Sequence, residues 1–342
     1  MQVLVVAEPT PGVAAPAVAS LVRGVWRRHA PADDVVALPV TLGGPGVLET
    51  LAGPDDTWLV TEAAGPHGHP VEAALLLRED GTALVEAARV AAGALAPGGS
   101  ASVGLATTYG VGELLQAARD ADARRILVDV AQVAAVDGGA GALTALGWRL
   151  RVEDGSGLKI GASDLPRVRA VEPGWSQDWS GVDVQVLTEH DATLLEAPEH
   201  LAADVEIGGG EAESLTAGLH AWAEVASRDL QASAAVVQPG SGAGGGLAFG
   251  LAAALGADLV RGADVLWDLQ RVDAAIAASD LVLVAASPAG AVGRRTLDTA
   301  TRLGVACHAL PDLGEGLAGV AEAEDAAAAL VEVAQRHVDT LR

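Results

Sequence analysis

Short runs of β-branched and other apolar residues alternate along much of the chain with longer segments in which apolar residues recur at helical spacing. The predicted strands cover residues 3–7, 35–40, 57–61, 126–130, 182–187, 281–285 and 305–310. The predicted helices cover residues 17–29, 47–51, 86–95, 114–121, 142–146, 215–225, 247–255, 296–303 and 325–341. Strands that alternate with helices predict an α/β protein with a parallel sheet and helical crossovers.

The middle of the chain departs from this alternation. Residues 71–77 and 82–85 flank an Asp-Gly pair, which is typical of a β-hairpin. Residues 152–179 are rich in Gly, Ser, Pro and Asp, and they predict an irregular excursion or a weak hairpin. Because the alternation resumes after this middle part, the pattern predicts a domain that is split in sequence by an insertion.

The densest glycine cluster lies in residues 239–246, between an apolar run at 234–237 and the predicted helix 247–255. Glycine lacks a Cβ atom, so the backbone N–H groups of such a loop can surround an anion that also faces the positive end of the helix dipole. The loop lacks the Lys-Ser/Thr ending of a Walker A motif. Two interpretations stay open: a loop that binds phosphate or carboxylate, and a turn that packs closely against the helix.

Two acidic positions are candidates for chemistry. Asp137 precedes two glycines at the start of the predicted helix 142–146, where it either caps the helix or takes part in catalysis. Asp191 follows Glu189 and His190 at the end of a predicted strand. Such a cluster either binds a divalent cation or a substrate, or simply caps and solvates the end of the strand.

Composition restricts the expected partners. The 342 residues carry a formal net charge of −24, which disfavours binding to nucleic acid or to an anionic membrane surface. Only 3% of the residues are aromatic, so Ala, Val and Leu must build the cores. Cys307 is the one cysteine, and the sequence has no signal-peptide or membrane-spanning pattern. The sequence therefore predicts a cytoplasmic protein.

Four blocks occur together in a distinctive order. They are a glycine loop with Gly43, Gly44 and Gly46, then TTYGVGE at residues 107–113, DGGAG at residues 137–141 and PGSGAGGGL at residues 239–247. In this register the blocks resemble those of the type I, ATP-dependent glycerate kinases. The chain is identified as a divergent member of that family.

The resemblance implies a discontinuous Rossmann-like domain from residues 1–64 and 280–342, with a second α/β domain of residues 65–279 inserted between them and carrying the glycine-rich loop. It implies ATP-dependent phosphorylation of glycerate or a related hydroxy acid, with ATP and Mg²⁺ as cofactors and no residue assigned as a metal ligand. The implied catalytic residues are Asp137 and Asp191. The implied cofactor-binding residues are Gly138, Gly139, Gly240, Gly242, Gly245 and Gly246.

Several charged positions of the family pattern are replaced in this chain. The N-terminal block APDSFKGS reads AEPTPGVA at residues 7–14, without its aspartate and lysine in place. In the earlier glycine loop, Leu42 replaces an Asp and Pro45 replaces a Glu. Arg294 or Arg295 can stand in for the missing lysine, although the geometry of the two side chains differs.

Phosphoryl transfer depends on such charges, so three interpretations stay open. The first is the ATP-dependent kinase. The second is a catalytically inactive family member that acts as a binding or scaffold protein. The third is a different phosphoester- or nucleotide-handling enzyme on the same fold. The oligomeric state is left open.

Overall fold

The computed structural model describes residues 1–10, 13–93, 103–159, 161–202 and 209–310. It confirms the α/β class. The chain divides into two compact units. Unit 1 comprises residues 1–42, 49–51 and those from 263 onward, and unit 2 comprises residues 43–48 and 52–262. Segments that are far apart in the sequence therefore form one unit, and the middle of the chain forms the other.

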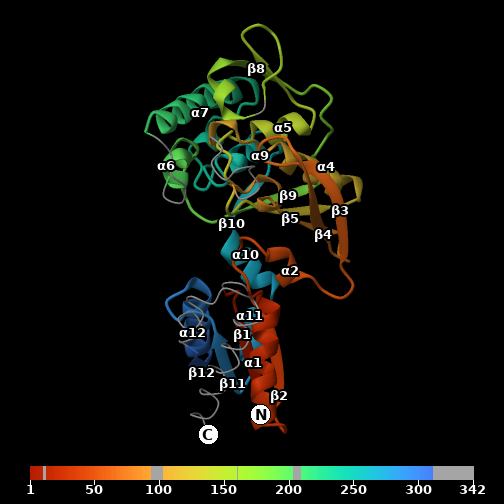
Figure 1. Ribbon diagram of the computed structural model, residues 1–342, viewed down its shortest axis with the longest axis vertical. Helices are drawn as coiled ribbons and strands as arrows, with labels where there is room; N and C mark the ends of the chain where they lie inside the picture. The colour runs from red at the N-terminus through yellow and green to blue at the C-terminus, as the bar shows by residue number, and fades with distance from the viewer. Residues whose placement is uncertain (11–12, 94–102, 160, 203–208, 311–342) are drawn as a thin grey trace. The chain divides into compact units, whose positions relative to one another are not determined.

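Unit 1 is built on a parallel sheet of order β12-β11-β1-β2 (Figure 1). Its strands are β1 (Gln2–Ala7), β2 (Asp34–Pro39), β11 (Leu281–Ala285) and β12 (Ala306–Ala309). Side chains alternate across a strand, so Val3 and Val5 join one core while Leu4 and Val6 join another. Such strands, buried on both faces, are typical of parallel sheets covered by helices.

The helices of unit 1 supply the two cores. α1 (Ala15–His29) contributes Val18, Val22 and Val25 to the core that contains Val3. The further helices of this part are α10 (Gly262–Leu269), α11 (Val272–Ala277) and α12 (Ala291–Leu303), whereas α2 (Val47–Leu51) is divided between the two units. Trp267 of α10 lies in the opposite core. The 3.6-residue periodicity that predicted α1 thus corresponds to its buried face.

Unit 2 contains a mixed sheet of order β10-β9-β6-β5-β4-β3. Its strands are β3 (Thr57–Ala64), β4 (Pro70–Leu77), β5 (Thr82–Glu86), β6 (Arg125–Asp129), β9 (Asp183–Thr188) and β10 (Asp258–Arg261). β5, β6, β9 and β10 run parallel, whereas β3 and β4 form an antiparallel hairpin, drawn in orange in Figure 1. The parallel strands therefore end at a common edge of the sheet.

The helices of unit 2 are α3 (Ala88–Ala91), α4 (Tyr109–Asp120), α5 (Ala140–Ala145), α6 (Ala197–Ala202), α7 (Gly209–Asp229), α8 (Ser233–Val236) and α9 (Leu247–Leu255). Short 3-10 segments cover Val103–Leu105, Ala162–Arg167 and Leu194–Glu196. Trp222 of α7 is fully buried and meets Phe249 of α9 edge to face, with ring centroids 6.2 Å apart. Within the described residues, the helices are too short or too polar to cross a membrane.

The chain passes between the two units at residues 43–52 and near residue 262. The sequence analysis placed the domain boundaries at residues 64 and 280 instead. The difference at the first boundary comes from β3. This strand pairs with β4 along its whole length, from Thr57 opposite Leu77 to Ala64 opposite Pro70. Chain order alone placed β3 with the preceding elements, but strand pairing places it in unit 2.

Other local predictions have mixed outcomes. The predicted hairpin is confirmed, because β4 pairs antiparallel with β5 across the Asp-Gly turn. The apolar run at 234–237, to which no element was assigned, lies mostly in the short helix α8, and Val237 beside it is 69% exposed. The predicted helix 325–341 lies outside the described residues.

The predicted excursion after residue 152 contains an antiparallel pair. β7 (Arg149–Val152) pairs with β8 (Val168–Glu172), and the register shifts between Arg151 and Val152. Leu150 and Val171 bury their side chains in the core around Trp222. The weak hairpin was thus a sound prediction for this segment.

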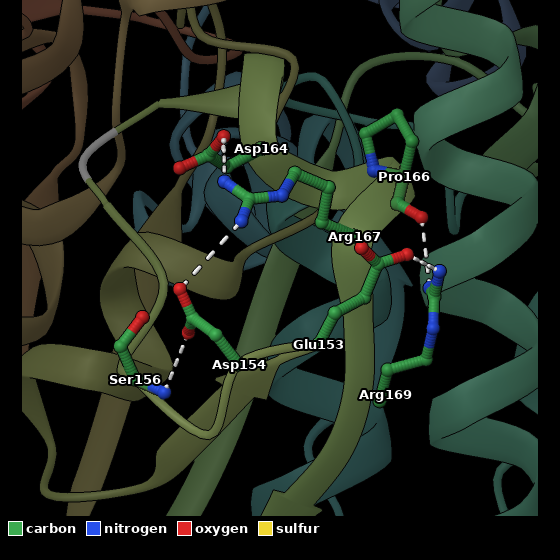
Figure 2. Close-up of polar contacts among 7 residues, drawn as sticks. All are labelled: Glu153, Asp154, Ser156, Asp164, Pro166, Arg167 and Arg169. Atoms are coloured by element: carbon green, nitrogen blue, oxygen red, sulfur yellow. Dashed lines mark hydrogen bonds and ion pairs between the residues drawn. The ribbon is translucent and has the colours of Figure 1, made fainter.

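Ion pairs link residues within and beside the segment that connects these two strands, as Figure 2 shows. Arg167 lies between Asp154 and Asp164, at 3.8 and 3.4 Å, and Arg169 pairs with Glu153. Except for Asp164, these side chains are 42% to 64% exposed. Each exposed pair therefore contributes at most about 1 kcal/mol to the stability of this segment.

Substitution of a helical glycine tests how tightly α9 packs. A Cβ atom on Gly250 would lie 2.7 Å from the Gly138 carbonyl oxygen, whereas one on Gly210 in α7 would meet open space. We expect Gly250→Ala to lower the free energy of unfolding by about 2 kcal/mol through overpacking. Gly210→Ala, the control, should leave it unchanged or raise it by about 0.5 kcal/mol. Urea unfolding followed by tryptophan fluorescence measures both, and equal effects would contradict the close approach.

Candidate active site

Two carboxylates end neighbouring strands in unit 2. Glu86 ends β5 and Asp129 ends β6, and the two residues are register partners in the parallel pairing. Leu187 of β9 is the next partner in line, followed by Thr188 and then Glu189. Ligands of parallel α/β sheets bind outside the carboxyl ends of the strands. This edge is therefore the candidate active site of unit 2.

Glu86 and Asp129 hold the earlier glycine loop. The Gly44 amide donates to Asp129 Oδ2 at 2.6 Å, and the Gly46 amide donates to Glu86 Oε1 at 3.2 Å. Arg89 Nε donates to the other Glu86 oxygen, Oε2, at 3.2 Å. Each of the two acidic residues is only 4% exposed. Hydrogen bonds to the loop and to Arg89 thus compensate for the burial of these charges.

The protonation of Asp129 is unusual. Burial raises the pKa of its carboxyl group to about 7, and the negative charges of Glu86 and Glu189 add to this shift. Hydrogen bonds from the Gly44 and Ala131 amides oppose it. A carboxyl group with a strongly shifted pKa at the ligand-binding edge of a sheet is a marker of functional sites.

Neither carboxylate was among the residues chosen from the sequence. Glu86 was taken as the first residue of a helix, yet it ends β5, and Asp129 was included in a strand without a role. Each one follows an apolar run directly, at Leu84-Val85 and Leu127-Val128. An acidic residue that closes a predicted parallel strand is the signal that could have identified both.

Asp137 is buried and surrounded by donors. The Thr108 amide donates to its carboxylate at 2.8 Å, and the Thr108 hydroxyl at 2.9 Å. The amides of Gly139 and Gly141 donate at 3.0 and 3.2 Å, and the Thr107 hydroxyl at 3.2 Å. Burial raises the pKa of this carboxyl group, while these hydrogen bonds lower it.

Asp137 therefore joins the start of α4 to the start of α5. It acts at the N-terminus of α5, as the cap interpretation expected, although the residue at the cap position itself is Gly139. At 1% exposure its carboxylate faces protein groups. The catalytic role remains a prediction.

The first turn of α9 is already occupied by protein groups. The amides of Leu247 and Phe249 donate to the carbonyl oxygens of Gly244 and Ser241, each at 3.1 Å. The loop 240–246 thus turns its own carbonyl groups toward the amides that an anion would use. At these two amides the geometry is that of the close-packed turn.

The loop also packs against the segment that follows β9. The Gly242 amide donates to the Ala192 carbonyl at 2.9 Å, and a Cβ atom on Gly242 would lie 2.4 Å from the Thr193 carbonyl oxygen. A Cβ atom on Gly240 would lie 3.0 Å from the Thr188 side chain. Glycine is needed here because another part of the backbone approaches too closely for a side chain.

The glycine blocks at residues 137–141 and 239–246 of unit 2 contact each other. The Gly138 amide donates to the Gly245 carbonyl at 3.1 Å. A Cβ atom on Gly245 would lie 1.7 Å from the Ala135 carbonyl oxygen, and one on Gly246 would lie 2.9 Å from the Gly138 Cα atom. One on Gly139 would lie 2.9 Å from the Cα atom of Gly250. Cofactor binding by these glycines stays a prediction.

Asp191 lies in a different environment from Asp137. Its side chain is 70% exposed and pairs with Arg261, the last residue of β10, at 3.2 Å. The neighbouring His190 packs on His200, with ring centroids 3.7 Å apart. Burial lowers the pKa of His190, and the nearby His200 lowers it further. The sequence placed the two aspartates in one site, but one is buried and the other is at the surface.

Unit 1 shows a similar carboxylate contact. Glu8, which follows β1, accepts a hydrogen bond from the Ser287 amide at 2.8 Å, and burial raises the pKa of its carboxyl group. Arg295 pairs with Asp264 at 2.7 Å and lies over the Trp267 ring. Arg294 is exposed in the first turn of α12 and donates to a backbone carbonyl. The replacement of the family lysine by either arginine remains a prediction.

Comparison with known proteins shows the family of this chain. The profile of the glycerate kinase family matches residues 10–334. The chain belongs to the glycerate kinase family. The glycerate kinase of Bacillus subtilis (strain 168) is 30% identical over 282 residues, which cover 81% of this chain and 73% of that protein. The glycerate 2-kinase of Escherichia coli K12 is 28% identical over 266 residues, covering 73% of this chain and 67% of that protein.

The fold of this glycerate kinase family member agrees with a solved structure. The crystal structure of a candidate glycerate kinase 2 from Salmonella typhimurium LT2 has a TM-score of 0.86 and 24% identity. The match covers 100% of this chain and 98% of that one. The family profile confirms the resemblance inferred from the glycine blocks, and the solved structure supports the fold.

The position of Asp137 makes its loss a test of structure. Asp137→Ala leaves five donors without an acceptor in a buried site, so we expect the free energy of unfolding to fall by about 3 kcal/mol or more. Asp191→Ala removes one exposed ion pair and should change it by less than about 0.5 kcal/mol. Urea unfolding of both variants measures the difference. Full stability of Asp137→Ala with loss of activity alone would contradict the structural role.

The raised pKa of Asp129 predicts a specific pH dependence of stability. Between the unfolded pKa near 4 and the folded value of about 7, the native state binds the proton more tightly than the unfolded state. Stability therefore falls as pH rises through this window, by roughly 4 kcal/mol in total for this group. Asp129→Asn should lack this decrease. Urea unfolding at several pH values from 4.5 to 8 compares the two proteins, and parallel curves would contradict the shift.

Proposed function

We propose that this protein phosphorylates glycerate or a related hydroxy acid, with MgATP as the phosphoryl donor. The observation that carries the proposal is the match of the family profile to residues 10–334, almost the whole chain. Relatives named glycerate kinase and the shared fold support it. The carboxylates at the strand ends of unit 2 supply chemistry that such a reaction needs.

Glu189 is our candidate for the proton acceptor. Transfer of a phosphoryl group to a hydroxyl requires a group that orients the hydroxyl and takes its proton. Asp129 and Glu86 are almost fully buried and bind the loop, whereas the Glu189 side chain is 39% exposed at the same edge. His190 lies 3.5 Å from its carboxylate. Accessibility to a substrate therefore favours Glu189.

Arg261 is our candidate for contact with the transferred phosphoryl group. Negative charge that develops in the transition state is stabilised by cations placed beside it. Arg261 ends β10, 64% of its side chain is exposed, and Asp191 orients its guanidinium group. In this proposal Asp191 acts through Arg261 and not as a metal ligand.

Mg²⁺ enters this proposal as part of the MgATP substrate. Within the described ranges, no group of three or more His, Cys, Asp or Glu side chains is arranged to hold a metal ion. Magnesium in phosphoryl-transfer sites is held largely by phosphate oxygens and water, with one or two carboxylates. The described residues are compatible with that mode, and a resident metal site is not part of the proposal.

The noncatalytic alternative rests on the replaced charges near Leu42 and Pro45. Family membership over almost the whole chain, together with two buried carboxylates and one accessible carboxylate at the strand ends, supports catalysis instead.

An assay of glycerate-dependent ADP formation from MgATP tests the proposal. Glu189→Gln should lower kcat by about a hundredfold or more because it removes the proton acceptor. Arg261→Ala should lower kcat/KM by a comparable factor. Glu172→Gln is the matched control. Glu172 ends β8, its side chain is half-exposed, and it pairs with Arg151 of β7. Absence of turnover in the unsubstituted protein, with no shift of its melting temperature by ATP or ADP, would favour the binding or scaffold role.

A further inference from the structure

The two glycine-rich loops of unit 2 differ in the space around them. Cβ atoms on Gly44 and Gly46 would meet no atom of the described residues within 4 Å, whereas those on Gly242 and Gly245 would collide with backbone. Gly44 and Gly46 are instead required by their backbone, since their φ angles are +86° and +88°. The loop that leaves room beside its backbone is therefore the one at residues 43–46.

This loop has lost its own acidic side chains. Where the family pattern has Asp and Glu, this chain has Leu42 and Pro45. Two carboxylates nevertheless contact the loop in space, from Asp129 at 2.6 Å and from Glu86 at 3.2 Å. They come from the ends of β6 and β5 rather than from the loop.

We propose that Asp129 and Glu86 are positioning residues for the loop 43–46, and that they hold it, through the Gly44 and Gly46 amides, in the conformation that binds the hydroxy-acid substrate. This inference rests on the proposed function for the role of the substrate. The attachment of the loop itself does not depend on that function.

The contacts of Asp129 explain why it should hold the loop more strongly than Glu86 does. The 2.6 Å bond from Gly44 is the shorter of the two, and bonds to charged acceptors are the stronger ones. The Glu86 carboxylate accepts hydrogen bonds from both the Gly46 amide and Arg89. The charged groups that face Asp129 are Glu86 from β5 and Glu189 from the segment after β9. Both favour the neutral form of Asp129.

Amide hydrogen exchange tests the attachment directly, with the full chain and without substrate. Asp129→Ala should increase the exchange rate of the amides at residues 44–47 by about tenfold to a hundredfold. Asp129→Asn retains an acceptor oxygen and should change the rate by less than about fivefold. Asp183→Ala is the control, because Asp183 starts β9 at the opposite edge of the sheet and pairs with Arg125. Unchanged exchange in Asp129→Ala would overturn the proposal.

Kinetics then test the role of the loop. Asp129→Ala should raise the KM for glycerate about tenfold or more with a smaller change in kcat, because the binding conformation is less populated. The KM of Asp129→Asn should stay within about fivefold of the unsubstituted value, because Asn retains an acceptor oxygen for the Gly44 amide. Faster exchange with an unchanged KM would overturn the substrate role. If the unsubstituted protein does not turn over glycerate, the proposed function fails, and the exchange experiment still decides the attachment.

Discussion

The arrangement of loops and helices in unit 2 depends on carboxylates that accept hydrogen bonds from the main-chain amides of glycine-rich turns. Asp137 is the central case, because one buried group binds the first amides of α5 and the Thr107–Thr108 turn that begins α4. Burial of such a charge is tolerated only when donors replace the lost water. The two helices are therefore joined by hydrogen bonds to one carboxyl group and not by apolar packing alone. Asp129 and Glu86 use the same contact to hold a loop.

Glycine serves two distinct physical purposes in this protein. In the segment 240–250 and at Gly138 and Gly139 it lets backbone approach backbone, so that the starts of α5 and α9 lie against each other. At Gly44 and Gly46 it supplies a left-handed backbone with room beside it. The first use creates a rigid support, and the second leaves a surface that a ligand can approach. A dense glycine motif is therefore not by itself a sign of anion binding.

The electrostatics of the candidate site depend on the positions of its charged residues at the strand ends more than on their number. Glu86, Asp129 and Glu189 gather at the carboxyl ends of parallel strands. Burial raises the pKa of Asp129, and the charges of the other two carboxylates add to this shift. Arg89 and Arg261 place positive charge at the same strand ends, each paired with a carboxylate. A reaction that moves a charged phosphoryl group needs both signs in close proximity.

Apolar periodicity by itself determined the alternating elements, the β4–β5 hairpin and the discontinuous unit, because side chains that must be buried impose the period of their own strand or helix. The glycine blocks also identified the family, since their order is a property of the chain. Only the tertiary structure decided that β3 belongs to unit 2, that the Gly242 amide bonds to the Ala192 carbonyl, and that Asp129 and Glu86 meet the loop 43–46. The place of β3 depends on strand pairing, and the contacts of Asp129 and Glu86 join residues 85 and 40 positions apart, which no local pattern records.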